Sequence, residues 1–304
     1  MTFTIDFMRF RFVAMALSGT VLVISIVSLL FFGINRGLDF TGGVLVELGF
    51  VEPTDANEIR EVLGSRGFPN VVVQNFGSEL DIGVRVPPTS GIDQSNVGNE
   101  IIVALESSYP GVVLRRSEYV GPAVGQELTE KGGLALLVAL AVVMVYIMLR
   151  FTGKFAIGAV IALVHDILIV VGVFATFGMT FNLTELAALL AVIGYSLNDT
   201  IVVSDRIREN FRAIRRQTPI EIINTSLNQT LNRTLVTSLT TLLVLVALLI
   251  AGGEQVFGFA LALTVGVVVG TYSSIFVAAT TLLLLRITSD DLTVPVKQGA
   301  EDLP

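Results

Sequence analysis

Long uncharged apolar runs separated by short polar segments dominate the chain. A helix needs roughly 20 residues to cross about 30 Å of hydrocarbon. Six runs come close to that length or exceed it, and we expect membrane helices over residues 12–33, 132–149, 155–177, about 182–204, about 233–251 and 255–285. Only the third and fourth runs carry acidic residues well inside them, Asp166 and Asp199. The pattern predicts a multi-pass α-helical membrane protein with six transmembrane helices.

Residues 34–131, between the first two runs, are far too many for a loop and predict a separate domain. Alternating apolar and polar positions indicate strands over residues 44–48, 71–73, 81–86 and 112–120, with a turn near Gly77. Thr54 is expected to cap a helix over residues 55–65, and Asp93 to cap another ending near Ser107. The resulting order, β-α-β-β-α-β, predicts an inserted α+β domain of the ferredoxin-like type.

Basic residues fall on alternate connections between the runs. They are Arg9, Arg11, Arg150, Lys154, Arg206, Arg208, Arg212, Arg215, Arg216 and Arg286. Short loops rich in Lys and Arg stay in the cytoplasm, so both termini are predicted to be cytoplasmic and the insert extracytoplasmic. The chain then divides into a cytoplasmic N-terminus with the first helix (1–33), the inserted domain (34–131), a five-helix bundle (132–288) and an acidic cytoplasmic tail (289–304).

The amino-acid composition also favours a membrane protein and disfavours several functional classes. Apolar residues make up 53% and charged residues 15% of the 304-residue chain, against about 45–50% and 25% in soluble domains. With 19 basic and 26 acidic residues the net charge is −7, which disfavours nucleic-acid binding. The chain has no Cys and one His, so we expect no disulfide, no thiol nucleophile and no His-only metal site. No cofactor and no enzymatic activity are expected.

Ionisable groups inside a membrane helix are costly and usually functional. Asp199 in the fourth run and Arg233 at the start of the fifth fall at similar depths by residue counting, so an ion pair between them is predicted. Polar residues continue the Arg233 face at helical spacing: Thr230, Thr234, Thr237 and Thr241. Arg233 as a snorkelling anchor and Asp199 as a structural hydrogen-bonding group stay open as alternatives.

His165 and Asp166 lie at the middle of the third run. Asp166 is predicted either to fix a neighbouring helix by hydrogen bonds or to take part in a proton relay, with His165 the weaker candidate. In the sixth run, Gly266 and Gly270 are spaced to let another helix approach closely.

Two enzymatic alternatives are weak. An aspartyl protease using Asp166 and Asp199 needs the two carboxyls close enough to share a proton, and their expected depths differ. A serine hydrolase using Ser196 and His165 lacks a nucleophile elbow.

Several motifs together resemble the SecF family, whose members belong to the bacterial SecD–SecF protein-export complex. GLDFTGG at residues 37–43 is similar to the family's GIDFTGG, and GPAVGQEL at 121–128 to GPxVGxEL. Further matches lie at residues 162–166, 194–210 and 228–234, although Ser204 stands where a Phe is expected. Carried over by motif position, Asp199 is the proton-binding carboxylate, Arg233 its counter-charge and Asp166 a further candidate, supported by Asn198, Asp39, Gly42, Gly43, Gly121, Pro122 and Gly125.

The resemblance implies half of an assembly of the resistance-nodulation-division type in the cell membrane, with SecD supplying six more helices. Members of the family use the proton gradient to help preproteins pass through SecYEG, and the insert moves on the outer side. A stand-alone ion or solute exporter of the same architecture is the alternative function.

Overall fold

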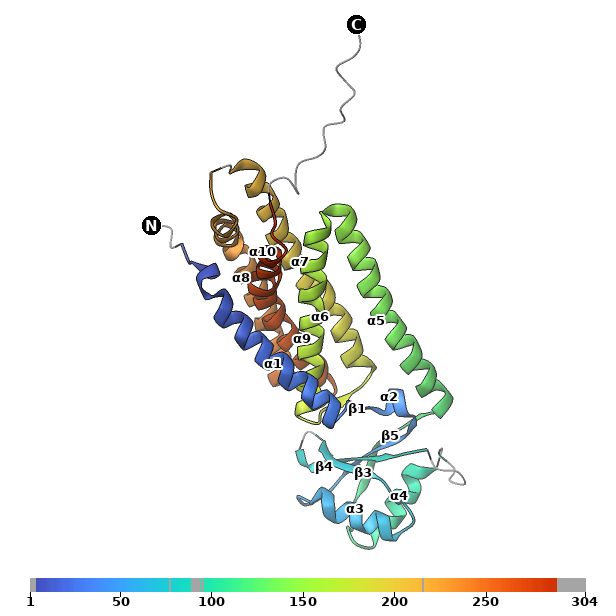
Figure 1. Ribbon diagram of the computed structural model, residues 1–304. Helices are drawn as coiled ribbons and strands as arrows, with labels where there is room; N and C mark the ends of the chain where they lie inside the picture. The colour runs from blue at the N-terminus through green and yellow to red at the C-terminus, as the bar shows by residue number, and fades with distance from the viewer. Residues whose placement is uncertain (1–3, 77, 89–93, 95, 215, 289–304) are drawn as a thin grey trace.

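The computed structural model describes residues 4–76, 78–88, 94, 96–214 and 216–288. Within these residues, six helices are long and apolar enough to cross a membrane, and they form one bundle (Figure 1). A small sheet covered by two helices lies at one end of the bundle, and the start of α1 and the end of α10 lie at the other. This is the predicted multi-pass bundle with an inserted α+β domain.

The membrane helices follow the predicted order. They are α1 (Arg11–Phe31), preceded by the short 3-10 helix η1 (Phe7–Phe10), α5 (Pro122–Arg150), α6 (Gly153–Thr176), α7 (Leu183–Ala213), α8 (Pro219–Ala251), and α9 (Glu254–Ser273), which continues through the π-helix η2 (Ser274–Ala278) into α10 (Ala279–Leu284). Helices α5, α7 and α8 extend well beyond the predicted apolar runs, because hydropathy marks only the part of a helix that lies in hydrocarbon.

The inserted domain holds β2 (Gly43–Gly49), α3 (Ala56–Ser65), β3 (Val72–Phe76), β4 (Ser78–Val86), α4 (Val97–Glu106) and β5 (Val113–Val120). This is the predicted order β-α-β-β-α-β. The strands form one antiparallel sheet in the order β3-β4-β2-β5. Alternate residues of the central strands β2 and β4 are fully buried beneath the helices, as expected for a sheet with one covered face: Val44, Val46, Leu48, Ile82 and Val84.

The cap of α3 differs from the prediction. Asp55, not Thr54, is the N-cap, and its carboxylate accepts a hydrogen bond from the Asn57 backbone N at 2.7 Å. Thr54 instead donates to the Glu52 carbonyl at 2.9 Å. The predicted cap Asp93, the turn residue Gly77, Arg215 and the acidic tail 289–304 lie outside the described residues.

Three short elements at the base of the inserted domain were not predicted. They are β1 (Asn35–Arg36), α2 (Leu38–Thr41) and β6 (Thr180–Phe181), the last in the connection between α6 and α7. Strands β1 and β6 pair in parallel, with Asn35 opposite Thr180. Elements this short carry no hydrophobic period, so only the tertiary structure reveals them.

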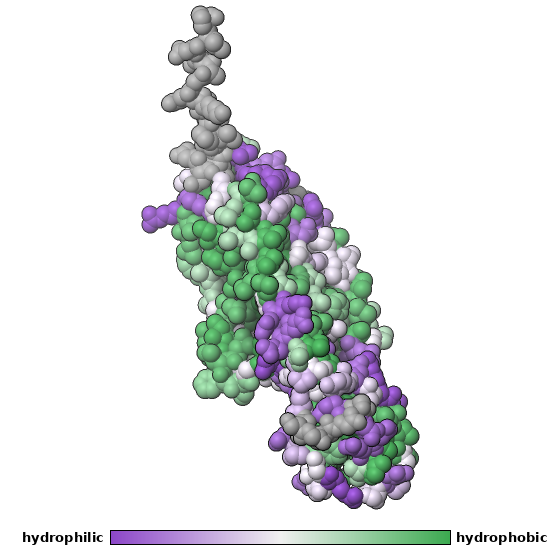
Figure 2. All heavy atoms as spheres, turned by 90° about the vertical axis from the view of Figure 1, so that its right-hand side faces the viewer, coloured by the Kyte–Doolittle hydropathy of each residue, from purple (hydrophilic) through white to green (hydrophobic). Residues whose placement is uncertain are grey.

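Helix α6 is the most deeply buried span, while α5 and α8 leave most of their apolar side chains exposed. Figure 2 shows apolar residues over the side of the bundle and hydrophilic residues concentrated over the inserted domain and at the opposite end. In a membrane, the exposed apolar side chains of α5 and α8 face lipid or another membrane chain.

Candidate functional site

Helices α7 and α9 meet closely in the bundle. A Cβ at Gly270 would lie 2.9 Å from the Ser196 Cβ, and one at Gly266 would overlap the Val192 side chain. The two glycines therefore allow the close helix approach predicted for them, and α7 is the partner. This contact brings the polar residues of both helices within reach of α6.

The first polar cluster, the Asp166 network, joins four helices through Ser18, His165, Asp166, Ser196 and Ser273. Asp166 is completely buried in α6. Its Oδ2 accepts hydrogen bonds from the hydroxyls of Ser196 on α7, at 2.5 Å, and Ser273 on α9, at 2.8 Å. Its Oδ1 lies 2.9 Å from His165 Nδ1, and His165 Nε2 lies 2.5 Å from Ser18 Oγ on α1.

Both carboxylate oxygens of Asp166 thus have short polar partners. Burial of a charge is tolerable when hydrogen bonds replace the lost water, and here three of them do. The arrangement fits the interpretation of Asp166 as a group that fixes neighbouring helices. The π-helix η2 begins directly after Ser273, and such local widening of a helix is frequent at functional sites.

The second polar cluster, the Asp199 group, contains Asp199, Ser238, Thr271 and Tyr195. Asp199 is 2% exposed, and its Oδ2 accepts from the Ser238 hydroxyl of α8 at 3.5 Å. Ser238 Oγ lies 2.6 Å from Thr271 Oγ1 of α9 and accepts from the Tyr195 hydroxyl at 3.4 Å. Among the described residues, Asp199 therefore has one long hydrogen bond where Asp166 has three short contacts, so an ionised Asp199 is much less compensated.

The two clusters lie on the same pair of helices. Ser196 and Asp199 are one turn apart on α7, and Thr271 and Ser273 are two residues apart on α9. A change of packing at Asp199 therefore acts on helices that also bind Asp166.

The predicted direct pair between Asp199 and Arg233 is not formed in the described structure. Arg233 is exposed, whereas Thr234 and Ser238 occupy the inward face of α8. Adjacent helical residues point about 100° apart, so Arg233 cannot share the direction of Thr234.

Arg233 also lines a cavity of about 230 Å³, together with Gln229, Thr230, Asp205, Glu209, Arg150 and Arg206. The cavity lies beside the helix turns that carry Asp199, because Ile201 and Val202 of α7 complete its lining. Polar and charged walls of this kind hold water readily.

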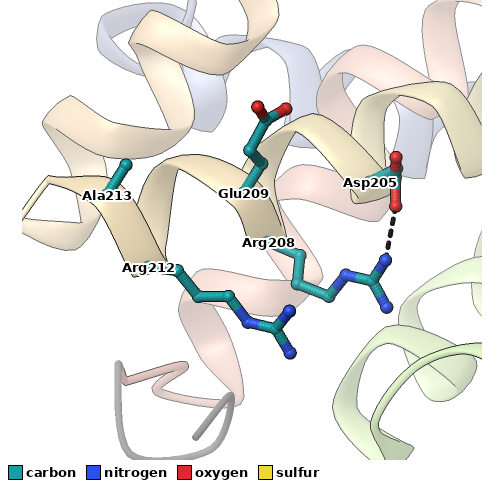
Figure 3. A pocket seen from close by; sticks show the side chains of 5 residues that line it. All are labelled: Asp205, Arg208, Glu209, Arg212 and Ala213. Atoms are coloured by element: carbon teal, nitrogen blue, oxygen red, sulfur yellow. Dashed lines mark hydrogen bonds and ion pairs between the residues drawn. The ribbon is translucent and has the colours of Figure 1, made fainter.

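Charged side chains continue along α7 beyond the bundle. A cavity of about 420 Å³ is lined by Asp205, Arg208, Glu209, Arg212 and Ala213 (Figure 3). Arg208 Nη2 donates to Asp205 Oδ1 at 2.6 Å, and Arg150 reaches the same oxygen at 3.2 Å. The acids and bases offset each other here, so the surface is no open anion site.

The motif residues gather where the insert meets the bundle. Asp39 Oδ2 accepts from the backbone N of Leu183, the first residue of α7, at 2.8 Å. Gly121 is the N-cap of α5 and Pro122 its first residue. Gly42 has a φ of +67°, which a residue with a side chain adopts only with strain. A Cβ at Gly125 would lie 2.9 Å from the backbone N of Gly42, so a side chain at Gly125 would also cause strain. A Cβ at Gly43 would overlap the Val86 carbonyl.

Arg85 adds a further link between the sheet and this junction. Its Nη1 donates to the Arg36 carbonyl at 2.7 Å, and its Nη2 to Asn35 Oδ1 at 3.2 Å. Burial lowers the pKa of the Arg85 guanidinium from its ordinary value, but arginine still keeps its charge at neutral pH. Strand β4 is thereby tied to β1, which pairs with β6 of the bundle.

Sequence reasoning missed the serine and threonine partners of the two acids. Ser238 follows Thr230 and Thr234 at four-residue spacing, so a stripe taken at that spacing would have found it. Thr237 and Thr241, which the prediction chose instead, donate to backbone carbonyls of their own helix. Asn198 is exposed on α7 and belongs to neither cluster.

The geometry gives the enzymatic alternatives no support. Asp166 and Asp199 hydrogen-bond to different serines rather than to each other. Ser196 donates to Asp166, and His165 contacts Ser18 and Asp166 rather than Ser196. In the part of the chain that the structure describes, no three His, Asp or Glu side chains are placed to hold a metal ion.

Comparison with known families gives two matches. Residues 101–288 match the model described as "Protein export membrane protein SecD/SecF, C-terminal", and residues 27–54 match the "SecD/SecF GG Motif". A protein translocase subunit SecF from Pseudomonas aeruginosa is 48% identical, over 99% of this chain and 98% of its own length. One from Vibrio alginolyticus is 49% identical, over 98% and 96%.

The fold of the chain is also similar to that of solved SecDF structures. The crystal structure of SecDF from Thermus thermophilus, described as a translocon-associated membrane protein, superposes with a TM-score of 0.85 at 36% identity, over 93% of this chain. This chain spans 39% of that longer one. SecDF in a super-membrane-facing form gives a TM-score of 0.66 at 38% identity, over 91% of this chain and 38% of the other.

Proposed function

The chain belongs to the SecD/SecF family of protein-export membrane proteins, and from this premise we propose that it uses the proton gradient to assist preprotein translocation. It is a multi-pass protein of the cell membrane and an accessory subunit of the Sec protein translocase. In this proposal it drives a conformational cycle and catalyses no chemical step of its own. Its partners are SecD, the SecYEG channel and the translocating preprotein.

The observation that carries the proposal is the contrast between the two buried acids. Asp166 has three short polar contacts, whereas the only hydrogen bond of Asp199 in the described structure is 3.5 Å long. A proton added to Asp199 removes a weakly compensated charge from a region of low dielectric. Asp199 is therefore the group on which a proton has the largest effect, and Asp166 holds the helices around it.

Arg233 serves in this mechanism as a counter-charge at a distance. A positive charge attracts an ionised carboxylate, and protonation of Asp199 would remove that attraction. The polar cavity beside Arg233 supplies water close to Asp199 at one side of the membrane. One charge moved through the whole field gains about 2.3 kcal/mol per 100 mV, and the pH difference adds to it.

In this proposal a movement of α7 reaches the inserted domain through Asp39, Gly42 and Gly125. Asp39 binds the start of α7, the helix that carries Asp199, and Gly42 packs against Gly125 of α5. A shift of α7 therefore pulls directly on the segment that leads into β2. We place both termini in the cytoplasm and the insert outside, because the Arg-rich helix ends lie opposite the insert.

An exposed polar face supports association with SecD. Asn198 of α7 and Arg233 of α8 are exposed, as are Asn232 and Thr240 of α8, and they lie beside exposed apolar residues such as Leu235 and Leu239. Polar groups at such positions face protein or water rather than lipid. A second six-helix chain packed against this face would cover them.

The substitution Asp199→Asn tests the proposal. Asn keeps the size and the acceptor for Ser238 but cannot bind and release a proton. We expect normal folding, normal copurification with SecD, and export from vesicles that no longer responds to an imposed proton gradient. The control is Glu61→Gln on α3, an exposed acid of the inserted domain that lines neither of the charged cavities.

Gradient-dependent export by the Asp199→Asn protein at the level of the control contradicts the proton role. Arg233→Lys refines the test: because no contact joins Arg233 to Asp199, a lysine that keeps the charge should retain most of the activity. Solute movement by the chain alone, without copurifying SecD, would favour the exporter alternative.

A further inference from the structure

An apolar groove with two arginines at its rim lies at the end of the bundle opposite the insert. It encloses about 520 Å³ where the start of α1, the start of α8 and the end of α10 meet. Its lining is largely apolar and includes Phe12, Met15, Ile220, Leu283 and Leu284, with Arg11 and Arg286 beside them. None of these residues takes part in the proton mechanism above.

We propose that this groove binds an anionic glycerophospholipid, with its phosphate between Arg11 and Arg286 and one acyl chain along the apolar lining. We infer a lipid from two properties of the groove: the positive charges of Arg11 and Arg286, and its largely apolar lining. Phe12 and Leu284 are 68% and 66% exposed on membrane-spanning helices, so the groove opens onto a lipid-facing surface. A free phosphate ion gains nothing from such walls, whereas a lipid matches both parts.

Arg11 is already oriented for an anion. Its Nη1 donates to the Met8 carbonyl at 2.8 Å, and its guanidinium lies 4.5 Å from the centre of the Phe12 ring. These two contacts fix the side chain and leave further N–H donors available, since a guanidinium has five. In the described part of the chain neither Arg11 nor Arg286 forms an ion pair.

Thr280 supplies a second, independent indication of a polar ligand. Its side chain lines the groove, the residue is 3% exposed, and its hydroxyl has no hydrogen-bond partner among the described residues. Buried hydroxyls are normally paired. Thr280 lies six residues before Arg286 along the chain, on the side toward the bilayer centre. The ester carbonyls of a lipid lie on that side of its phosphate, and a rotation of the Thr280 side chain would bring its buried hydroxyl to one of them.

The backbone at Arg286 is unusual in a way that fits binding. Its φ is +52°, and Arg286 and Ile287 donate to the carbonyls of Leu283 and Leu282 as α10 ends. Glycine is the common residue at such a helix end because it adopts positive φ without strain. A non-glycine residue at positive φ stores backbone strain, and such strain clusters at ligand-binding and active sites.

The test measures lipid binding to the full-length protein purified in neutral detergent. Native mass spectrometry gives apparent affinities for dioleoyl-phosphatidylglycerol and dioleoyl-phosphatidylcholine, with inorganic phosphate as competitor. We expect Arg11→Gln and Arg286→Gln each to weaken phosphatidylglycerol binding by roughly ten-fold, the loss of about one charge-assisted hydrogen bond. The matched control is Arg9→Gln, an exposed arginine two residues away that does not line the groove.

Arg286→Gly separates binding from stability. It should weaken phosphatidylglycerol binding as Arg286→Gln does, while thermal stability stays equal or rises because the positive φ is relieved. Equal losses in Arg9→Gln and Arg11→Gln overturn the proposal, and so does equal affinity for the two lipids. Displacement of bound lipid by inorganic phosphate at millimolar concentration would show a simple anion site and also overturn it.

Discussion

The Asp166 network should be a major source of stability for the bundle, and Asp166→Ala tests this. The substitution removes a completely buried carboxylate and leaves its three partners, Ser196, Ser273 and His165, without their acceptor. No water is expected to replace the carboxylate fully inside a packed membrane bundle. Contacts among α6, α7 and α9 should weaken together.

The magnitude follows from the number of hydrogen bonds. Hydrogen bonds between membrane helices average about 0.6 kcal/mol and reach about 1.7 kcal/mol each. Three such bonds give about 2–5 kcal/mol for Asp166→Ala, and one gives about 0.6–1.7 kcal/mol for Ser273→Ala. Asp166→Asn should cost less than Asp166→Ala, because the amide still accepts on its oxygen and the serine hydroxyls can turn to accept from its nitrogen.

Unfolding by SDS in mixed micelles measures these differences. The chain has no Trp, so far-UV circular dichroism is the suitable signal. The structure supplies a matched control in Ser274→Ala: Ser274 is as completely buried as Ser273, but in the described part of the chain its hydroxyl donates only to the Thr271 carbonyl, on the same continuous helix. The two serine variants differ in whether the lost hydroxyl reached Asp166.

Two results would refute the reasoning. One is an equal loss of stability in Ser273→Ala and Ser274→Ala. The other is a loss below about 0.6 kcal/mol in Asp166→Ala, less than one average interhelical hydrogen bond.

Two further predictions concern the junction between insert and bundle. Gly125→Ala should destabilise by about 1–3 kcal/mol in a thermal melt, because the new methyl meets the backbone of Gly42 at 2.9 Å; Gly133→Ala on the same helix, where a Cβ meets nothing within 4 Å, should be neutral or stabilising. Arg85→Lys cannot hold both acceptors in β1 and should raise deuterium exchange of Arg36, measured by mass spectrometry; unchanged exchange would show that Arg85 does not hold that strand.

The sequence determined the parts of this protein that depend on local patterning. Apolar runs of membrane length gave the six helices, and period-two alternation gave the strands of the insert. The capping box of α8, in which Thr218 and Glu221 exchange hydrogen bonds, also depends on local sequence alone, because the two residues are three positions apart. The spacing of Gly266 and Gly270 predicted a close helix contact but did not identify the partner helix.

Only the tertiary structure decided which polar groups meet. Ser18 and His165 are 147 positions apart along the chain, and Ser273 and Asp166 are 107 apart. The same holds for Asp39 and Leu183, which join the insert to α7 across 144 positions. Pairings of this kind depend on the rotation and depth of whole helices, which hydropathy does not specify. Counting residues put Asp199 and Arg233 at one depth, but the rotation of α8 turns Ser238 inward and Arg233 outward.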